Sequence, residues 1–373
     1  MGFNFRPHDI QGCRFKMIKN EILKRKMPDF FVKDGAKIDS LEKWEEYRNE
    51  LRDLILGEEY GALQPKIIPS VEIKNGPHGF GGKASWQSIY FTFENTGKRY
   101  TVKTDLILPR DAKNIPVFIN IGFEREIPNK YFPVEEILDN GFGVFYFCYK
   151  DVTEDDGDFE SGLAGLFENG GKDFGKISLW AYMAIQCMDY LITLGEVDKE
   201  NIAVIGHSRL GKTALLTAAL DERFKLCCTN NSGCCGASIS RGKTDKNEKI
   251  NDITRVFPFW FKESFIKYVD NEDSLPFDQH MLLSLVAPRY IVIGGAKEDY
   301  WADNDGQFLS AYLASYAWEL YGEKGLISDN YIPKESEKLL DGKLGFYLRE
   351  REHFLSRYDW NVYMDKFKEI IKR

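Results

Sequence analysis

The 373-residue sequence has no apolar run of the roughly 18 residues that a membrane-spanning helix needs. It also has no dense cluster of Lys and Arg, and its formal net charge is −8. Phosphate binding requires a concentrated basic surface, so we expect neither nucleic acid nor a membrane as a partner. Residues 1–28 lack a signal-peptide core. The chain as given is therefore expected to be cytoplasmic, or secreted if a leader has been removed.

The seven cysteines follow no regular spacing, although two adjacent pairs occur, Cys227-Cys228 and Cys234-Cys235. A disulfide framework or a structural zinc site would require regular spacing, so neither is predicted. Buried free thiols are expected instead. No feature of the sequence requires a metal ion or an organic cofactor, and the oligomeric state is left open.

Short apolar runs alternate with helical stretches through much of the chain. The runs have the texture of buried parallel strands and lie at 116–121, 144–148, 202–205, 225–229 and 290–293. Helical stretches between them cover 176–194 and 210–220. This alternation predicts a mainly parallel sheet with helices on both faces, the three-layer α/β sandwich of α/β-hydrolases.

One domain, residues 1–373, is expected, with two additions to the central sheet. The first is an N-terminal helical extension over 1–65, which includes an amphipathic helix over 38–61. The second is an elaboration over 232–285 that would cover the active-site end of the sheet. Neither a linker nor an internal repeat divides the chain.

The most informative stretch is NIAVIGHSRLGKTAL, residues 201–215. A buried strand ends at Ile205 and a helix begins almost at once, with a turn of small residues between them. Such a strand–turn–helix holds a serine in a strained conformation above the sheet, and here that serine is Ser208. The strict pattern is G-x-S-x-G; here Gly206 stands in its place, but the second glycine, Gly211, comes one position late.

A serine nucleophile needs a histidine to take its proton and an acid to orient that histidine. The sequence has five histidines, His8, His78, His207, His280 and His353. The first two precede the main sheet, the third lies in the turn itself, and the fourth lies in a helix-like run that favours a structural role. His353 remains, just after a short strand at 345–348, where α/β-hydrolases place their histidine.

The acid should follow the strand that begins at 290, which runs directly into Glu298 and Asp299. Adjacent carboxylates point in different directions, so only one of them can face the imidazole. Spacing alone does not separate these two candidates.

The run from Gly206 to Lys212 resembles the G-x-S-R-x-G-K elbow of glucuronoyl esterases, carbohydrate esterase family 15, especially the bacterial ones. Other runs agree with that family: 230–237 (NNSGCCGA), 275–281 (LPFDQHM), 298–303 (EDYWAD), and 44–48 followed by Tyr60-Gly61. The resemblance covers most of the chain.

The resemblance implies an esterase that cleaves bonds between glucuronic acid on xylan and lignin alcohols. It implies Ser208 as the nucleophile, His353 as the general base and Asp299, rather than Glu298, as the acid. The sequence departs from the family at Asn231, where many members carry a glutamate after the strand that follows the elbow. The negative charge of the triad must therefore come from Asp299.

Three further roles follow from the resemblance. Arg209 would reinforce the oxyanion hole, as suits a fixed cation where negative charge develops. Lys212 would hydrogen-bond sugar hydroxyls, and Trp301 would line the sugar site.

The leading hypothesis is a serine carboxylesterase acting on 4-O-methyl-glucuronoyl esters through an acyl-enzyme on Ser208. One alternative is a deacetylase of acetyl xylan or oligosaccharides. Lys212, expected on the acyl side, favours the first hypothesis because a uronate acyl group carries hydroxyls. Another alternative is a non-catalytic carbohydrate-binding protein on a hydrolase fold. Arg241, Glu248 and Arg255 could contact a sugar acid, but solvated surface charge is the expected role of each.

Overall fold

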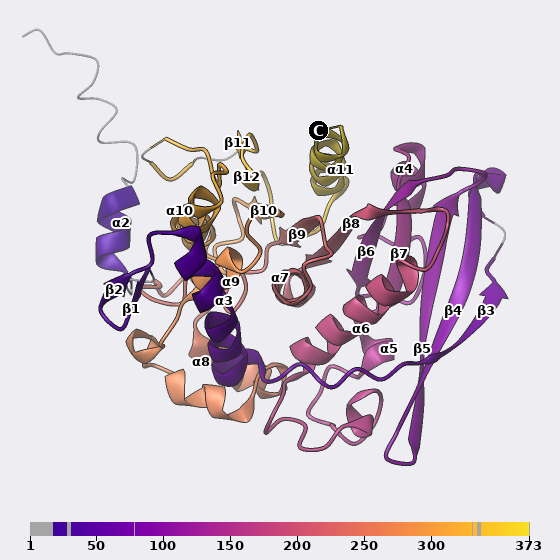
Figure 1. The fold of residues 1–373 in the computed structure, drawn as a ribbon, viewed down its shortest axis with the longest axis horizontal. Coiled ribbons are helices and arrows are strands. Elements are labelled where there is room, and N and C mark those ends of the chain that lie inside the picture. Colours follow the sequence, from indigo (N-terminus) through magenta and orange to yellow (C-terminus); the bar gives the residue numbers. More distant parts are fainter. Residues whose placement is uncertain (1–17, 28–30, 78, 330, 334–336, 373) are drawn as a thin grey trace, which may run out of the picture.

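The computed structural model describes residues 18–27, 31–77, 79–329, 331–333 and 337–372. His8, Cys13 and His78 therefore lie outside the described residues. Within them, ten strands form one sheet in the order β11-β12-β10-β9-β8-β6-β7-β5-β4-β3 (Figure 1). These strands are β3 (Ser70–Asn75), β4 (Ala84–Asn95), β5 (Lys98–Pro109), β6 (Ile115–Gly122), β7 (Gly143–Cys148), β8 (Val197–His207), β9 (Leu226–Asn230), β10 (Tyr290–Ala296), β11 (Lys338–Leu339) and β12 (Leu344–Arg349).

Helices connect and cover these strands, and a separate small hairpin precedes them. The α-helices are α2 (Ile18–Lys24), α3 (Leu41–Ile55), α4 (Val134–Asp139), α5 (Tyr149–Val152), α6 (Lys176–Leu191), α7 (Arg209–Leu220), α8 (Ile250–Val256), α9 (Gln279–Ser284), α10 (Asn304–Leu320) and α11 (Arg357–Ile371). The small hairpin pairs β1 (Val32–Lys33) with β2 (Ala36–Lys37).

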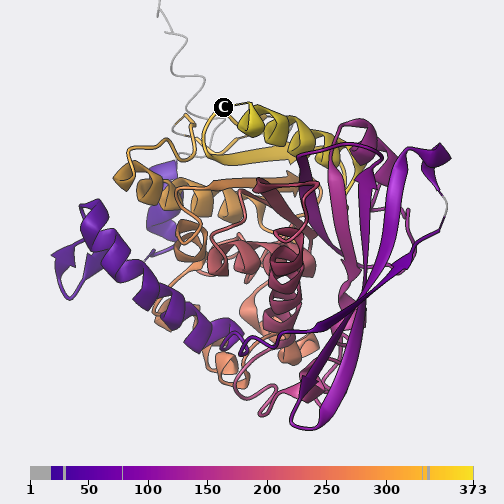
Figure 2. The same ribbon diagram turned by 45° about the vertical axis from the view of Figure 1, so that its right-hand side comes forward.

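The centre of the sheet is parallel and its margins are antiparallel. Strands β7, β6, β8, β9, β10 and β12 pair in parallel, whereas β3, β4, β5 and β11 join antiparallel. The purple strands β4 and β5 are the long ones at the right of Figure 2. Every residue of β7, β9 and β10 is buried, because helices cover both faces. The five predicted strands of the alternating pattern are confirmed.

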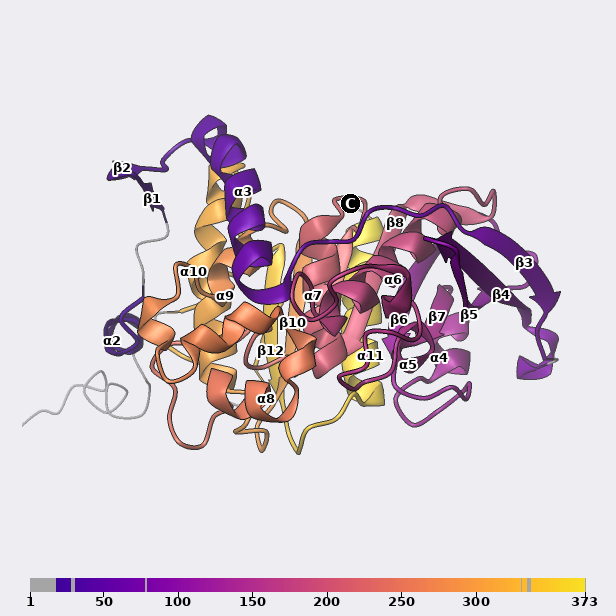
Figure 3. The ribbon, with the colours of Figure 1, turned by 90° about the horizontal axis from the view of Figure 1, so that it is seen from below.

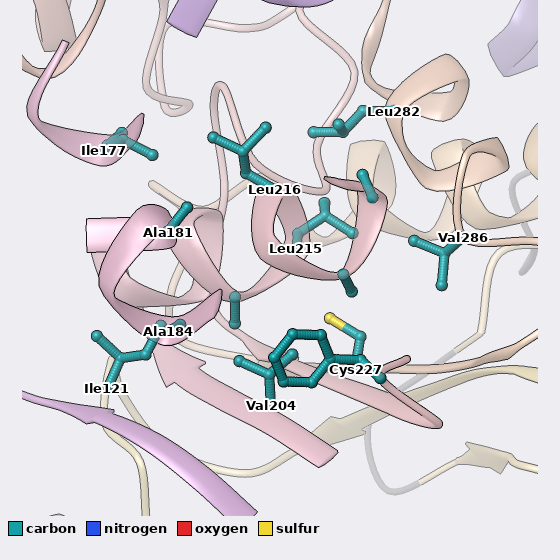
Figure 4. Packing of buried hydrophobic residues seen from close by; sticks show 14 of the residues in the cluster. Ile121, Ile177, Ala181, Ala184, Val204, Leu215, Leu216, Cys227, Leu282 and Val286 are labelled. Carbon is teal, nitrogen blue, oxygen red and sulfur yellow. The ribbon is translucent and has the colours of Figure 1, made fainter. Parts of the chain in front are cut away.

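Two hydrophobic clusters hold the three layers together. One cluster joins one face of the sheet to α6, α7, α9 and α10, and the other joins the opposite face to α4 and α11. Along β8, Val204 belongs to the first cluster while Ala203 and Ile205 belong to the second, as the alternation of a strand requires. Figure 4 shows Val204 and Cys227 beneath Leu215 of α7, and Figure 3 shows α6 and α7 in front of the sheet.

This arrangement confirms the predicted three-layer α/β fold. Because both clusters pack on the same sheet, it also supports the proposal that the chain forms a single domain. None of the described helices is long and apolar enough to cross a lipid bilayer. The six cysteines of the described residues are free and buried, as expected.

The helix predicted over 38–61 is present in two parts. It begins after Ser40, whose side chain accepts a hydrogen bond from the Lys43 backbone N–H at 3.3 Å. Helix α3 then continues into a π-helical turn, Leu56–Tyr60, and ends at Gly61 with φ 82°. A Cβ at Gly61 would lie 2.3 Å from the Asp173 carbonyl oxygen, so only glycine allows this approach. Helix α3 packs against α9 and α10.

The π-helical turn buries a carboxyl group in the protein interior. Glu59 is fully buried, and its Oε2 accepts a hydrogen bond from Gln279 Nε2 at 2.9 Å. Burial raises the pKa of this carboxyl from 4.5 to about 7. The folded protein therefore keeps a proton that the unfolded chain releases between those two pH values.

We predict that Glu59→Gln changes how stability depends on pH. In the wild type, the free energy of unfolding falls as pH rises from 4.5 to about 7. With about 1.4 kcal/mol per pKa unit, this loss is at most about 3.5 kcal/mol. The variant keeps the acceptor oxygen but has no proton to lose. Its melting temperature relative to the wild type should rise between pH 4.5 and about 7, where Glu59 is ionised in the unfolded chain but protonated in the folded protein. A difference that stays constant with pH would contradict the buried acid.

Candidate active site

Ser208 lies in a tight turn between β8 and α7. Its backbone has φ 58° and ψ −126°, a sparsely populated conformation for a residue with a side chain. The Ser208 N–H donates to the Asn230 carbonyl at the end of β9 (2.8 Å), and its own carbonyl accepts from the Gly211 N–H (2.9 Å). The turn is thus fixed on both sides, and the serine side chain is partly exposed.

The two glycines around Ser208 are explained by close backbone contacts. A Cβ at Gly206 would lie 2.0 Å from the Leu210 carbonyl oxygen, so no side chain fits there. A Cβ at Gly211 would lie 3.0 Å from the Asn230 carbonyl oxygen, where α7 crosses β9. The second glycine is therefore needed where the helix meets the neighbouring strand, one position later than in the strict pattern.

Strands β10 and β12 bring the predicted acid and base together. The His353 Nδ1 donates to Asp299 Oδ2 at 2.6 Å. Asp299 is buried, whereas the side chain of Glu298 is exposed. Burial opposes ionisation of Asp299, but the hydrogen bonds from His353 and Asn231 outweigh it and lower the pKa of this carboxyl. The geometry thus favours Asp299 over Glu298 as the partner of the imidazole.

Asn231 is the residue at which the sequence departs from the pattern expected from the resemblance, and its side chain binds the acid. Its Nδ2 donates to the same Asp299 Oδ2 at 2.6 Å. Its backbone has φ 47°, and its N–H donates to the Gly294 carbonyl of β10 at 2.7 Å. The Asn231 side chain thus supplies a donor that stabilises the ionised form of Asp299.

His207 precedes the serine and packs against the base. Its ring centroid lies 4.5 Å from that of His353, and its Nδ1 donates to Asn230 Oδ1 at 2.7 Å. Burial and the neighbouring His353 lower the pKa of His207 to about 3. His207 is therefore neutral at pH 7, and its uncharged ring packs against the ring of His353. This contact places the base beside the turn that carries Ser208.

Arg209, predicted to stabilise an oxyanion, is held by partners that the sequence did not reveal. Its Nη1 donates to Asp155 Oδ2, and its guanidinium lies 4.5 Å from the centroid of the Trp260 ring. The Trp260 Nε1 donates to Asp155 Oδ1 at 2.7 Å, and the Tyr149 hydroxyl donates to Oδ2 at 3.0 Å. The Arg209 guanidinium is thus oriented from two sides at the start of α7.

Lys212 and Trp301 are connected through Glu248. The Glu248 carboxylate lies 3.8 Å from Lys212 Nζ, and its backbone N–H donates to the Trp301 carbonyl at 2.9 Å. The Lys212 amine also donates to the Ser232 carbonyl at 2.5 Å. Trp301 keeps 48% of its surface exposed.

Two expectations about surface charges are wrong. Glu248 is only 15% exposed in its side chain, because it faces Lys212. Arg241 is buried and pairs with Asp278 at 3.0 Å, so it is a structural cation rather than a solvated one. Arg255 is exposed, as expected. Within the described residues, no group of three or more His, Cys, Asp or Glu side chains is arranged to hold a metal ion.

Comparison with known proteins identifies the family. The sequence profile of fungal glucuronyl esterases matches residues 91–322, more than half of the chain. A carbohydrate esterase from an unknown prokaryotic organism is 31% identical, over 94% of this chain and 91% of that protein. The chain belongs to the glucuronoyl esterase family.

Other glucuronoyl esterases agree with this assignment. The 4-O-methyl-glucuronoyl methylesterase of Phanerochaete carnosa is 27% identical, over 82% of this chain and 74% of that protein. The solved structure of the glucuronoyl esterase from Solibacter usitatus has a TM-score of 0.83 and is 30% identical, covering 92% of this chain and 97% of that one. The predicted family, fold and enzyme class, a carboxylic ester hydrolase, are confirmed.

Asp299→Asn should test which acid serves this glucuronoyl esterase. Removing the charge beside His353 leaves the imidazole poorly oriented, so kcat should fall about 10⁴-fold. Glu298→Gln, next in sequence and exposed, should change kcat less than about tenfold. Steady-state ester hydrolysis by both variants measures the difference. A larger loss in Glu298→Gln would reassign the acid.

Asn231→Asp should shift the pH dependence of the reaction. A second carboxylate would replace the amide that stabilises the Asp299 anion, so the pKa of Asp299 would rise. The added charge would also stabilise a protonated His353. Both effects move the acid limb of the kcat/KM profile to higher pH, by about one unit. Asn231→Leu, which removes the donor without adding charge, should shift it less. An unchanged acid limb in both variants would contradict this role of Asn231.

Proposed function

We propose that Ser208 is the nucleophile of a glucuronoyl ester hydrolysis. The Ser208 Oγ attacks the ester carbonyl, and His353 takes the hydroxyl proton and passes it to the departing alcohol. Water then attacks the acyl-enzyme with His353 as base, which releases the uronic acid and restores the serine. Asp299 orients the imidazole and stabilises its charged form through the 2.6 Å hydrogen bond.

The oxyanion of both tetrahedral intermediates would lie at the start of α7. The backbone N–H of Arg209, next to the nucleophile, points toward this position in α/β-hydrolases, and the helix N-terminus adds a positive potential. The Arg209 guanidinium, held by Asp155 and Trp260, supplies a fixed cation close by. Donors positioned before the reaction stabilise developing charge without reorganisation.

The substrate assignment rests on three connected residues, Lys212, Glu248 and Trp301, which we call the uronate wall. Lys212 lies one turn of helix after Ser208 and is joined to Glu248 and, through it, to Trp301. These residues offer a donor, an acceptor and a half-exposed aromatic ring, a combination that suits a hydroxylated sugar ring. We infer that the sugar is the acyl part, as in 4-O-methyl-glucuronoyl esters linking xylan to lignin alcohols. The location, cytoplasmic or, if a leader has been removed, secreted, stays a prediction.

A substrate panel should separate this function from its alternatives. Wild-type protein should hydrolyse benzyl glucuronate with a higher kcat/KM than acetylated xylan or p-nitrophenyl acetate. Ser208→Ala should lose at least about 10⁴-fold in kcat on benzyl glucuronate, because no other hydroxyl occupies the turn. Hydrolysis rates and burst kinetics measure both effects.

The other outcomes are equally informative. Preference for acetylated xylan would identify a deacetylase, in which the sugar is the leaving alcohol. Binding of glucuronoxylan without turnover of any ester would identify a carbohydrate-binding protein. Full activity in Ser208→Ala would show that the nucleophile is misassigned.

A further inference from the structure

The loop that carries Asp299 and Trp301 ends in a buried carboxylate. Asp303 is 3% exposed and caps α10, with its Oδ1 accepting from the Gly306 N–H at 3.1 Å. Its backbone is left-handed, with φ 53°. A buried carboxylate requires paired charge and hydrogen bonds, and its partners therefore determine where this loop can lie.

The N-terminal segment supplies the main partner of this carboxylate. Arg25, directly after α2, makes a bidentate ion pair with Asp303. Its Nη1 lies 2.9 Å from Oδ2 and its Nη2 lies 3.0 Å from Oδ1. Its Nη1 also donates to the Arg241 carbonyl at 3.2 Å. A Cβ at Gly242 would lie 2.6 Å from Arg25 Cγ, so the backbone there fits closely around the arginine side chain. Lys243 pairs with Asp303 Oδ2 at 3.2 Å.

The same segment that contacts Arg25 continues to the uronate wall. Asn247 Nδ2 donates to the Tyr300 carbonyl at 2.8 Å. One residue later, the Glu248 N–H donates to the Trp301 carbonyl at 2.9 Å. Residues 241–248 and 299–303 thus run side by side, joined by Asp303 at one end and Glu248 at the other.

We propose that Arg25 is a positioning residue that holds the uronate wall in place, a role that rests on the proposed function. Arg25 joins α2, the Arg241 carbonyl and Asp303 in one buried contact. Without the guanidinium, Asp303 keeps one cation among the described residues, the Lys243 amine, beside hydrogen bonds from the Ser238 hydroxyl and the Gly306 N–H. The two chain segments then lose the bidentate contact that joins them to α2. Trp301 and Glu248, which contact the sugar, would then lie less accurately.

The catalytic acid, Asp299, lies in the same loop but is held by different residues. Asp299 is held by His353 and Asn231 through its side chain, and its carbonyl accepts from Asn304 Nδ2 at 3.3 Å. Loss of Arg25 should therefore affect the sugar side of the site more than the triad. A rise in KM that is confined to the sugar substrate would therefore distinguish this positioning role from a general loss of stability.

Arg25→Met tests the proposal on two substrates. The KM for benzyl glucuronate should rise about tenfold, while kcat/KM for p-nitrophenyl acetate, which has no sugar to bind, should stay within about twofold of the wild type. Lys26→Met is the matched control and should leave both values unchanged, because within the described residues Lys26 forms its ion pair with the exposed Asp273, at 3.0 Å. Arg25→Lys keeps the charge but not the two-pronged geometry, so its KM should be intermediate.

Equal losses on both substrates, or a KM for benzyl glucuronate that matches that of Lys26→Met, would overturn the role of Arg25. Thermal unfolding of each variant is measured in parallel. If Arg25→Met does not fold, Arg25→Lys carries the test, and an unchanged KM in that variant overturns the role. A wild type inactive on benzyl glucuronate but active on p-nitrophenyl acetate would instead overturn the proposed function and, with it, this dependent role.

Discussion

The close contact between α7 and the end of β8 determines the rest of the active site. At Gly206 a side chain would lie 2.0 Å from the Leu210 carbonyl oxygen, and at Gly211 it would press on the Asn230 carbonyl. With both side chains absent, the helix starts immediately after the strand and forces Ser208 to φ 58°. The hydrogen bond from the Ser208 N–H to Asn230 then ties the strained turn to β9, so the strain is balanced by neighbouring structure.

From that turn, the parallel sheet gathers the other groups at one edge. Asn231 follows β9, Asp299 follows β10 and His353 follows β12. Because β9, β10 and β12 are neighbours, residues that are distant in sequence meet on a single carboxylate oxygen. The carboxylate then needs no second acid: an amide supplies the donor that keeps it ionised, and a neutral His207 supports the base from behind.

Patterns in the sequence predicted the sheet, its main helices and the places of Ser208 and His353. Strand burial and the strand–turn–helix are visible in short stretches of sequence, and the chain has few histidines to choose among. Spacing could not separate Glu298 from Asp299, since the choice depends on the turn that buries one side chain and exposes the other. Asp155 lies 54 residues before its partner Arg209, in an acidic loop typical of solvated surface. The burial of Arg25 and Arg241 could not be predicted either, because each is buried by pairing with an aspartate that is distant in the sequence.

The pairing of Arg209 with Asp155 also has a consequence for the last step of the proposed catalytic cycle. Hydrolysis turns a neutral ester into a carboxylate, which an isolated guanidinium would bind through two strong hydrogen bonds. In this site one Nη of Arg209 is already engaged by Asp155, and the aspartate charge repels an incoming anion. In the proposed mechanism, the same carboxylate that orients the cation toward a transient oxyanion would thus weaken its attraction for the carboxylate product. This would ease product release and limit inhibition by accumulating uronic acid.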